Sequence, residues 1–140
     1  MHKQIVAYSY TEQGGRKLLS WSTILYGALL SAVAAAALVA VFIRPRQLSV
    51  IVTAAAGALL GPLAWNAILR VTHGTNFFHD APITVLPASW QDTGSGVFTT
   101  ALTAMALGFG PLSGAGTGRR LAVAAALSGV AAFLVDVYLY

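Results

Sequence analysis

The sequence predicts an all-α fold: a four-helix transmembrane bundle in which two tight helical hairpins are joined by one longer loop. Hydrophobic residues make up 57% of the 140-residue chain and charged residues only 9%. A soluble domain carries roughly 25% charged residues, so this chain has too little charge to cover a soluble surface. Four apolar stretches lie between short polar breaks, and each approaches the ~20 residues needed to cross a bilayer.

Residues 1–18 are interpreted as a polar N-terminal tail and 19–140 as a single integral-membrane domain. The four spans are expected at about 19–43, 48–69, 93–112 and 121–140. The first hairpin is tight because Pro45, between two arginines, cannot continue a helix. Small residues spaced four apart, such as Gly57 and Gly61, are expected to let helix backbones approach closely.

The second hairpin follows a loop at 70–92. Ser89, Asp92 and Thr93 all offer N-cap oxygens near the start of the third span. The glycine-rich SGAGTGRR segment, residues 113–120, predicts a flexible turn before the fourth span.

Four spans place the tail, the 70–92 loop and the C-terminus on one side, here called side A, and the two tight turns on side B. All four acidic residues of the chain fall on side A, whereas side B has arginines alone. Side A carries Lys3, Arg16, Lys17 and Arg70, and side B carries Arg44, Arg46, Arg119 and Arg120. This tie leaves the positive-inside rule undecided. The acid-free arginine turns favour side B as the cytoplasmic side, while Arg16-Lys17 directly before the first span favours side A.

A polar cluster is predicted at the side-A end of the bundle. Its members are Asn66, Arg70, Asp92 and Asp136. One interpretation is structural: Arg70 forms an ion pair with Asp136 or Asp92 at the membrane interface. The other is a site for a polar substrate or a proton, because ionisable residues in spans usually serve a function.

The 70–92 loop contains a possible metal-binding set, His73, His79 and Asp80, since imidazole and carboxylate are suitable metal ligands. Their spacing matches no metal signature, and a solvated loop explains the same residues. The chain has no cysteine, which excludes disulfides, cysteine-ligated zinc and iron–sulfur clusters. The sequence does not identify a cofactor.

The same loop is rich in apolar residues, which predicts a lid at the membrane interface or a docking surface for a partner. Phe77, Phe78 and Trp90 are the residues expected to form that interaction surface.

These features favour a multi-pass protein of the cell membrane that is an accessory or assembly subunit of a larger membrane complex. Its expected partners are the lipid bilayer and other membrane subunits or further copies of itself. Nucleic acid is not expected, because the few basic residues flank apolar runs. Two alternatives stay open: a small-solute transporter or channel that uses the polar cluster, and a membrane enzyme or metal-handling protein that uses the loop. The lack of a catalytic motif favours a non-enzymatic role.

Overall fold

The computed structural model describes residues 19–74, 83–110, 112–114 and 116–139. The regular elements within these ranges are four helices: α2 (Trp21–Phe42), α3 (Leu48–Val71), α4 (Trp90–Phe109) and α5 (Gly118–Leu139). The prediction of a helical protein is therefore confirmed for the described part of the chain. Three of these helices, α2, α3 and α5, are long and apolar enough to cross a membrane.

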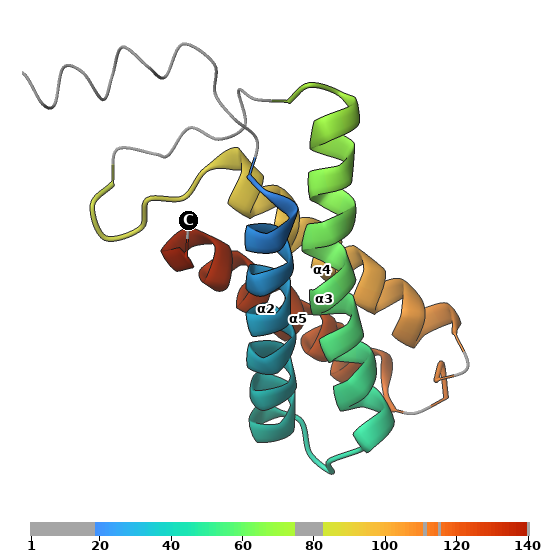
Figure 1. Cartoon of the computed structure of the whole chain (residues 1–140). Helices are drawn as coiled ribbons and strands as arrows, with labels where there is room; N and C mark the ends of the chain where they lie inside the picture. The colour runs from blue at the N-terminus through green and yellow to red at the C-terminus, as the bar shows by residue number, and fades with distance from the viewer. Residues whose placement is uncertain (1–18, 75–82, 111, 115, 140) are drawn as a thin grey trace, which may run out of the picture.

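The helices form two antiparallel pairs that cross each other. Figure 1 shows α2 and α3 running side by side, with α4 and α5 inclined behind them. Each helix packs against the next along the chain, α5 packs against α2, and α3 also meets α5. The end of α5 lies beside the start of α4, which brings polar residues from two distant parts of the sequence together (Figure 1).

Side-chain caps determine where two helices begin. Ser20 Oγ accepts a hydrogen bond from Thr23 N at 3.2 Å at the start of α2. Ser89 and Asp92 form a capping box at the start of α4, in which the Asp92 carboxylate accepts from Ser89 N at 2.7 Å. Ser89 is thus the N-cap, and α4 starts earlier than the predicted residue 93.

Glycines of α3 allow α4 to approach closely. A Cβ atom on Gly57 would overlap Thr103 Oγ1, and one on Gly61 would overlap both the side chain and the backbone of Thr99. The predicted close approach at these two glycines is confirmed. Such backbone-level packing is typical of membrane helices, whose association gains little from apolar burial.

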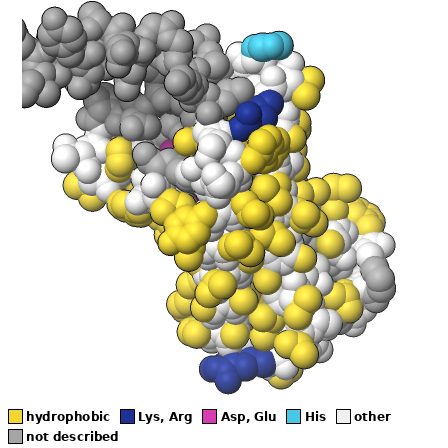
Figure 2. All heavy atoms as spheres, viewed as in Figure 1, with side chains coloured by type: hydrophobic (Ala, Val, Ile, Leu, Met, Phe, Trp, Pro, Cys, Tyr) yellow, Lys and Arg dark blue, Asp and Glu magenta, His cyan; other side chains and the backbone are white. Residues whose placement is uncertain are grey.

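Apolar side chains cover the outside of the molecule, while polar ones occupy much of the inside. Large apolar residues are exposed on every helix, including Val33, Leu60, Val97 and Val130. Figure 2 shows hydrophobic side chains over most of one face. The buried polar residues within the helices are Ser31, Asn66, Gln91, Asp92, Ser95, Thr99, Thr103, Ser128 and Asp136. Helices of water-soluble proteins bury their apolar stripe and expose polar residues, so this surface is suited to hydrocarbon.

The interior changes character along the bundle axis. Toward side B it is an apolar cluster, made mainly of Val39, Ile43, Val50, Leu107 and Leu121. Toward side A, the buried residues include Asn66, Gln91 and Asp136. The buried ionisable and amide side chains of the described helices therefore lie toward side A, and the apolar cluster lies toward side B.

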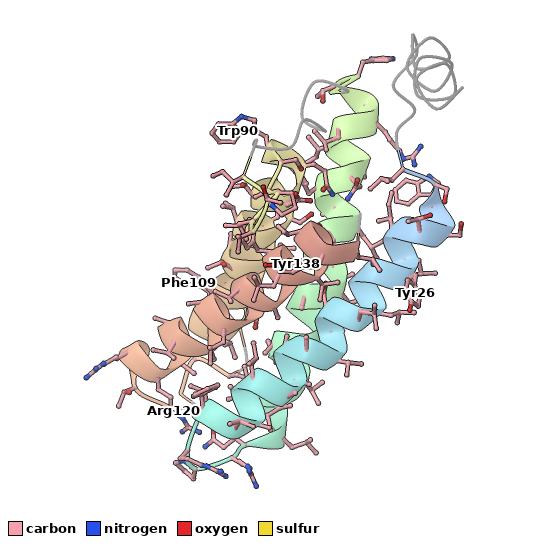
Figure 3. All side chains as sticks on the ribbon, turned by 90° about the vertical axis from the view of Figure 1, so that its left-hand side faces the viewer. Tyr26, Trp90, Phe109, Arg120 and Tyr138 are labelled. Carbon is pink, nitrogen blue, oxygen red and sulfur yellow. The ribbon has the colours of Figure 1, made fainter. Side chains whose placement is uncertain are left out.

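Arg120 links the two side-B turns, and Arg46 bonds within its own hairpin. The Arg120 guanidinium donates to the carbonyl of Pro45, and Arg46 Nε donates to Ala40 O at 2.7 Å. Figure 3 shows Arg120 at the level of the α2–α3 turn. Both arginine-rich turns consequently meet at one end of the molecule.

Candidate functional site

The polar cluster predicted from the sequence contains three ionisable side chains, those of Arg70, Asp92 and Asp136. Asp136 is the most deeply buried of the three. It lies in the last turn of α5, and only 1% of its surface is exposed. Its Oδ2 atom accepts a long hydrogen bond of 3.5 Å from Gln91 Nε2. Its Oδ1 atom is buried and has no hydrogen-bond partner in the described structure. A buried carboxyl oxygen without a partner is energetically costly, so it marks a place where a ligand or a proton would add stability.

Two residues of α4 complete the surroundings of this carboxyl group. Gln91 and Ser95 are four residues apart and both fully buried, so they share the inward face of the helix. Gln91 Nε2 lies 3.5 Å from Ser95 Oγ as well as from Asp136 Oδ2. The Ser95 hydroxyl shares Gln91 Nε2 with Asp136 and lies on the same buried face, within electrostatic reach of the carboxyl group. These contacts define the Asp136 pocket, made of Asp136, Gln91 and Ser95.

Sequence reasoning did not select Gln91 or Ser95, although a signal for both is present. Polar residues recur on α4 at every fourth position, as Gln91, Ser95, Thr99 and Thr103. All four are buried, and Leu107 continues the same face toward side B. A polar stripe of helical period within an apolar segment predicts an inward-facing polar surface.

Asp92 has a structural role at the same end of the bundle. Its Oδ2 atom accepts from both the backbone N and the hydroxyl of Ser89, at 2.7 and 2.8 Å. Its carboxyl group is also close enough to Asp136 to interact electrostatically. Asp92 therefore anchors α4 and adds a second acidic group beside the Asp136 pocket.

Arg70 has partners other than the carboxylates expected from the sequence. Its guanidinium donates to the carbonyl of Leu19 and lies 4.6 Å above the ring of Trp21. A cation over an indole face is a favourable contact. Arg70 thus ties the end of α3 to the start of α2.

Asn66 is buried, but its amide serves its own helix. Asn66 Nδ2 donates to Pro62 O at 2.9 Å. Pro62 lies inside α3, where it lacks the N–H that a helix normally uses. The Asn66 side chain therefore reinforces the turn that follows the proline.

His73 directly follows Thr72, the C-cap of α3, and is exposed. It adopts a left-handed conformation with φ of 54°, and Gly74 N donates to Leu69 O at 2.8 Å, as in a Schellman motif. Of the other residues predicted as metal ligands or contact residues, His79, Asp80, Phe77 and Phe78 lie outside the described residues. Within the described ranges no group of three or more possible metal-ligating side chains occurs.

Trp90, the first residue of α4, is 69% exposed. Figure 3 shows its ring directed away from the bundle. Tyr138 donates from its hydroxyl to Val85 O at 3.0 Å, which fastens the segment before α4 to α5. Trp90 thus lies exposed at the start of α4, and its predicted contact with the membrane interface or a partner stays a prediction.

No family model matches the chain, and no curated protein or solved structure matches it.

Proposed function

We propose that this chain is a multi-pass protein of the cell membrane with four spans, the fourth provided by α4. With 20 residues, α4 would extend about 30 Å, close to the thickness of the hydrocarbon core. Five of its polar residues, Gln91, Asp92, Ser95, Thr99 and Thr103, are buried, Thr93 and Thr100 are partly buried and bond backbone carbonyls of α4 or its N-cap, and Val97, Met105 and Phe109 are exposed. Its low overall hydropathy thus comes mostly from side chains that face the other helices, and the hydroxyls of Thr93 and Thr100 bond backbone carbonyls, so its outer face suits lipid.

We further propose that the protein transports a small polar solute or ion through the interior of the bundle. The observation that carries this proposal is the buried carboxyl group of Asp136, with one oxygen unpartnered, inside a bundle whose outer surface is apolar. Ionisable residues within membrane helices are costly and are usually kept for ion or substrate pathways. Because the described interior toward side B is an apolar cluster, the proposed transport would require that cluster to open.

Solid-supported membrane electrophysiology tests the transport proposal. Proteoliposomes would be exposed to rapid concentration jumps of cationic, neutral and anionic small solutes. We expect transient currents or coupled fluxes with at least one of these solutes, and loss of them in Asp136→Asn. Ser128→Ala is the matched control, because Ser128 is a buried side chain of α5 that bonds only Ala124 O at 2.9 Å in the described structure. Signals equal to those of protein-free liposomes for every solute class would contradict the proposal.

A second candidate is the accessory or assembly subunit of a membrane complex. It is favoured by an apolar groove of about 540 Å³ on the outer surface between α4 and α5. The groove is lined mainly by small residues, including Gly96, Thr100, Ala104, Ala126 and Gly129. Small-residue surfaces let a further membrane helix pack closely.

A substitution that fills the groove between α4 and α5 distinguishes the transporter from the accessory subunit. Ala104→Phe would occupy the groove without touching the Asp136 pocket. If the chain is a subunit, co-purification in a mild detergent should recover a heteromeric complex that Ala104→Phe disrupts and Asp136→Asn leaves intact. A chain that purifies without other subunits from its native membrane would count against this candidate.

A further inference from the structure

We propose that the Asp136 pocket binds a small monovalent cation, either a proton or a sodium ion, held by the Asp136 carboxyl group with Ser95 and Gln91 as neighbouring polar groups. This inference rests on the proposed function, because it assumes that the pocket lies within the membrane. It adds the class of ligand that the pocket would bind.

The geometry favours a ligand at Oδ1 of Asp136. Oδ2 has the Gln91 amide as a donor, whereas Oδ1 is buried and without a partner in the described residues. Gln91 Nε2 lies 3.5 Å from both of its acceptors, which is at the weak limit of hydrogen bonding. The carboxyl group is therefore poorly satisfied in the absence of a ligand, although the site is almost fully enclosed.

The surrounding charges favour a cation. On α4, the charged neighbour of Asp136 is another acid, Asp92. On α3, Arg70 is engaged by Leu19 and Trp21, and His73 is exposed at the end of the helix. On α2, the only titratable side chain in the helix is Tyr26, which is 57% exposed. No described basic group thus neutralises Asp136, and an unneutralised charge in this environment is unfavourable.

The size and chemistry of the pocket favour a monovalent ion. Ser95 and Gln91 are fully buried, which leaves little room for an organic cation. The available ligand atoms are the carboxylate oxygens of Asp136 and the hydroxyl oxygen of Ser95, which suit hard cations more than soft transition metals, while Gln91 Nε2 donates to the carboxylate and positions it. A divalent ion usually recruits several carboxylates, but Asp92 is already held by two hydrogen bonds from Ser89.

Thermal unfolding of the purified full chain in nanodiscs tests the inference at equilibrium, separately from transport. NaCl would be titrated against choline chloride at constant ionic strength, at several pH values, because a ligand that binds the folded state raises the melting temperature. We expect a sodium- or pH-dependent melting temperature in wild type and its loss in Asp136→Asn. Ser128→Ala should respond as wild type does.

Sodium and proton binding predict different dependences of the melting temperature on NaCl and pH. A sodium ion predicts a rise in melting temperature with NaCl that weakens as the pH falls, because protons compete for the carboxylate. A proton predicts no response to NaCl and a difference in pH profile between wild type and Asp136→Asn. Either pattern supports the inference. Equal responses of wild type and Asp136→Asn to both NaCl and pH would overturn it.

Milder variants keep the test decisive if Asp136→Asn does not fold. For a sodium site, Ser95→Ala should raise the half-saturating concentration about tenfold through one lost ligand contact, and Gln91→Ala should raise it by a similar factor because the carboxylate loses the donor that positions it. For a proton site, the same variants should shift the midpoint of the pH profile. Wild-type values in both variants would overturn the inference. Cation binding without solute flux would contradict the transport proposal and leave the cation site standing. Solute flux that does not depend on Asp136 would contradict the cation site and leave the transport proposal standing.

Discussion

The side-chain oxygen of Thr103 in α4 occupies the place where a Cβ atom of Gly57 in α3 would lie. The same relationship repeats one turn along, where Thr99 faces Gly61. Neither threonine hydroxyl has a hydrogen-bond partner in the described structure. The two helices therefore meet with threonine oxygens against glycine backbone, a geometry in which glycine Cα–H groups can make weak contacts to oxygen.

We predict that Gly61→Ala destabilises the bundle more than Gly57→Ala does. At Gly57 the added methyl group meets a side chain that can rotate, but at Gly61 it also meets the backbone of Thr99. Overpacking of this kind costs about 1–3 kcal/mol. Thermal unfolding in detergent would give the loss of stability of each variant relative to wild type.

Gly108→Ala is the control for this pair, because a Cβ atom at Gly108 has nothing within 4 Å. Since Gly108 lies in α4, alanine there should be neutral or stabilising by up to ~1 kcal/mol. Equal melting temperatures for all three variants would contradict the close contact between α3 and α4.

We predict that Arg70 and Asp136 are energetically independent. The Arg70 guanidinium contacts Leu19 and Trp21, and Asp136 contacts Gln91. In a double-mutant cycle, Arg70→Gln and Asp136→Asn should therefore have additive effects on melting, within about 0.5 kcal/mol. Arg70→Gln and Trp21→Leu should instead be non-additive. Strong coupling between Arg70 and Asp136 would restore the ion pair proposed from the sequence.

We predict that His73→Gly is neutral or stabilises the folded state. His73 has a φ of 54°, a left-handed conformation that glycine adopts without steric cost but other residues do not. The gain should not exceed the ~1–2 kcal/mol of the left-handed penalty. Melting in detergent, with and without added Zn²⁺, provides the measurement. If His73 is instead a metal ligand, the wild type alone should gain stability from the metal.

We predict that side B is cytoplasmic and that the chain crosses the membrane four times. Alkaline phosphatase fused after Tyr140 should then be active, whereas a fusion at Gly116, in the turn before α5, should be inactive. The reason is that the short turns of side B carry arginines and no acidic residue, since the count of basic residues is equal on the two sides. Reversed signals would invert the orientation, and equal signals at both positions would rule out α5 as a span.

Much of the fold could be predicted from the sequence, because helix formation and helix ends depend mainly on local residue patterns. Apolar runs of membrane length predicted the helical segments, and Pro45 marked the first turn correctly between α2 and α3. The boundary of α4 was less accessible, because Ser89, Asp92 and Thr93 are all capable N-caps. The choice of Ser89 depends on its reciprocal hydrogen bonds with Asp92, which only the folded turn displays.

The candidate site, too, was predictable from the sequence in part, and the rest depended on the packing of the helices. Composition and the position of Asp136 near the end of an apolar helix were enough to predict a polar group beneath side A. Which partners it meets depends on how α4 and α5 cross, and Gln91 and Asp136 are 45 residues apart in the chain. Arg70 was an equally plausible partner by sequence, but the packing of α3 against α2 places its guanidinium at Leu19 and Trp21. The sequence by itself determined the helices and their apolar character, since these follow from short-range patterns. Tertiary packing alone decided which polar side chains are buried together, because that depends on contacts between distant segments.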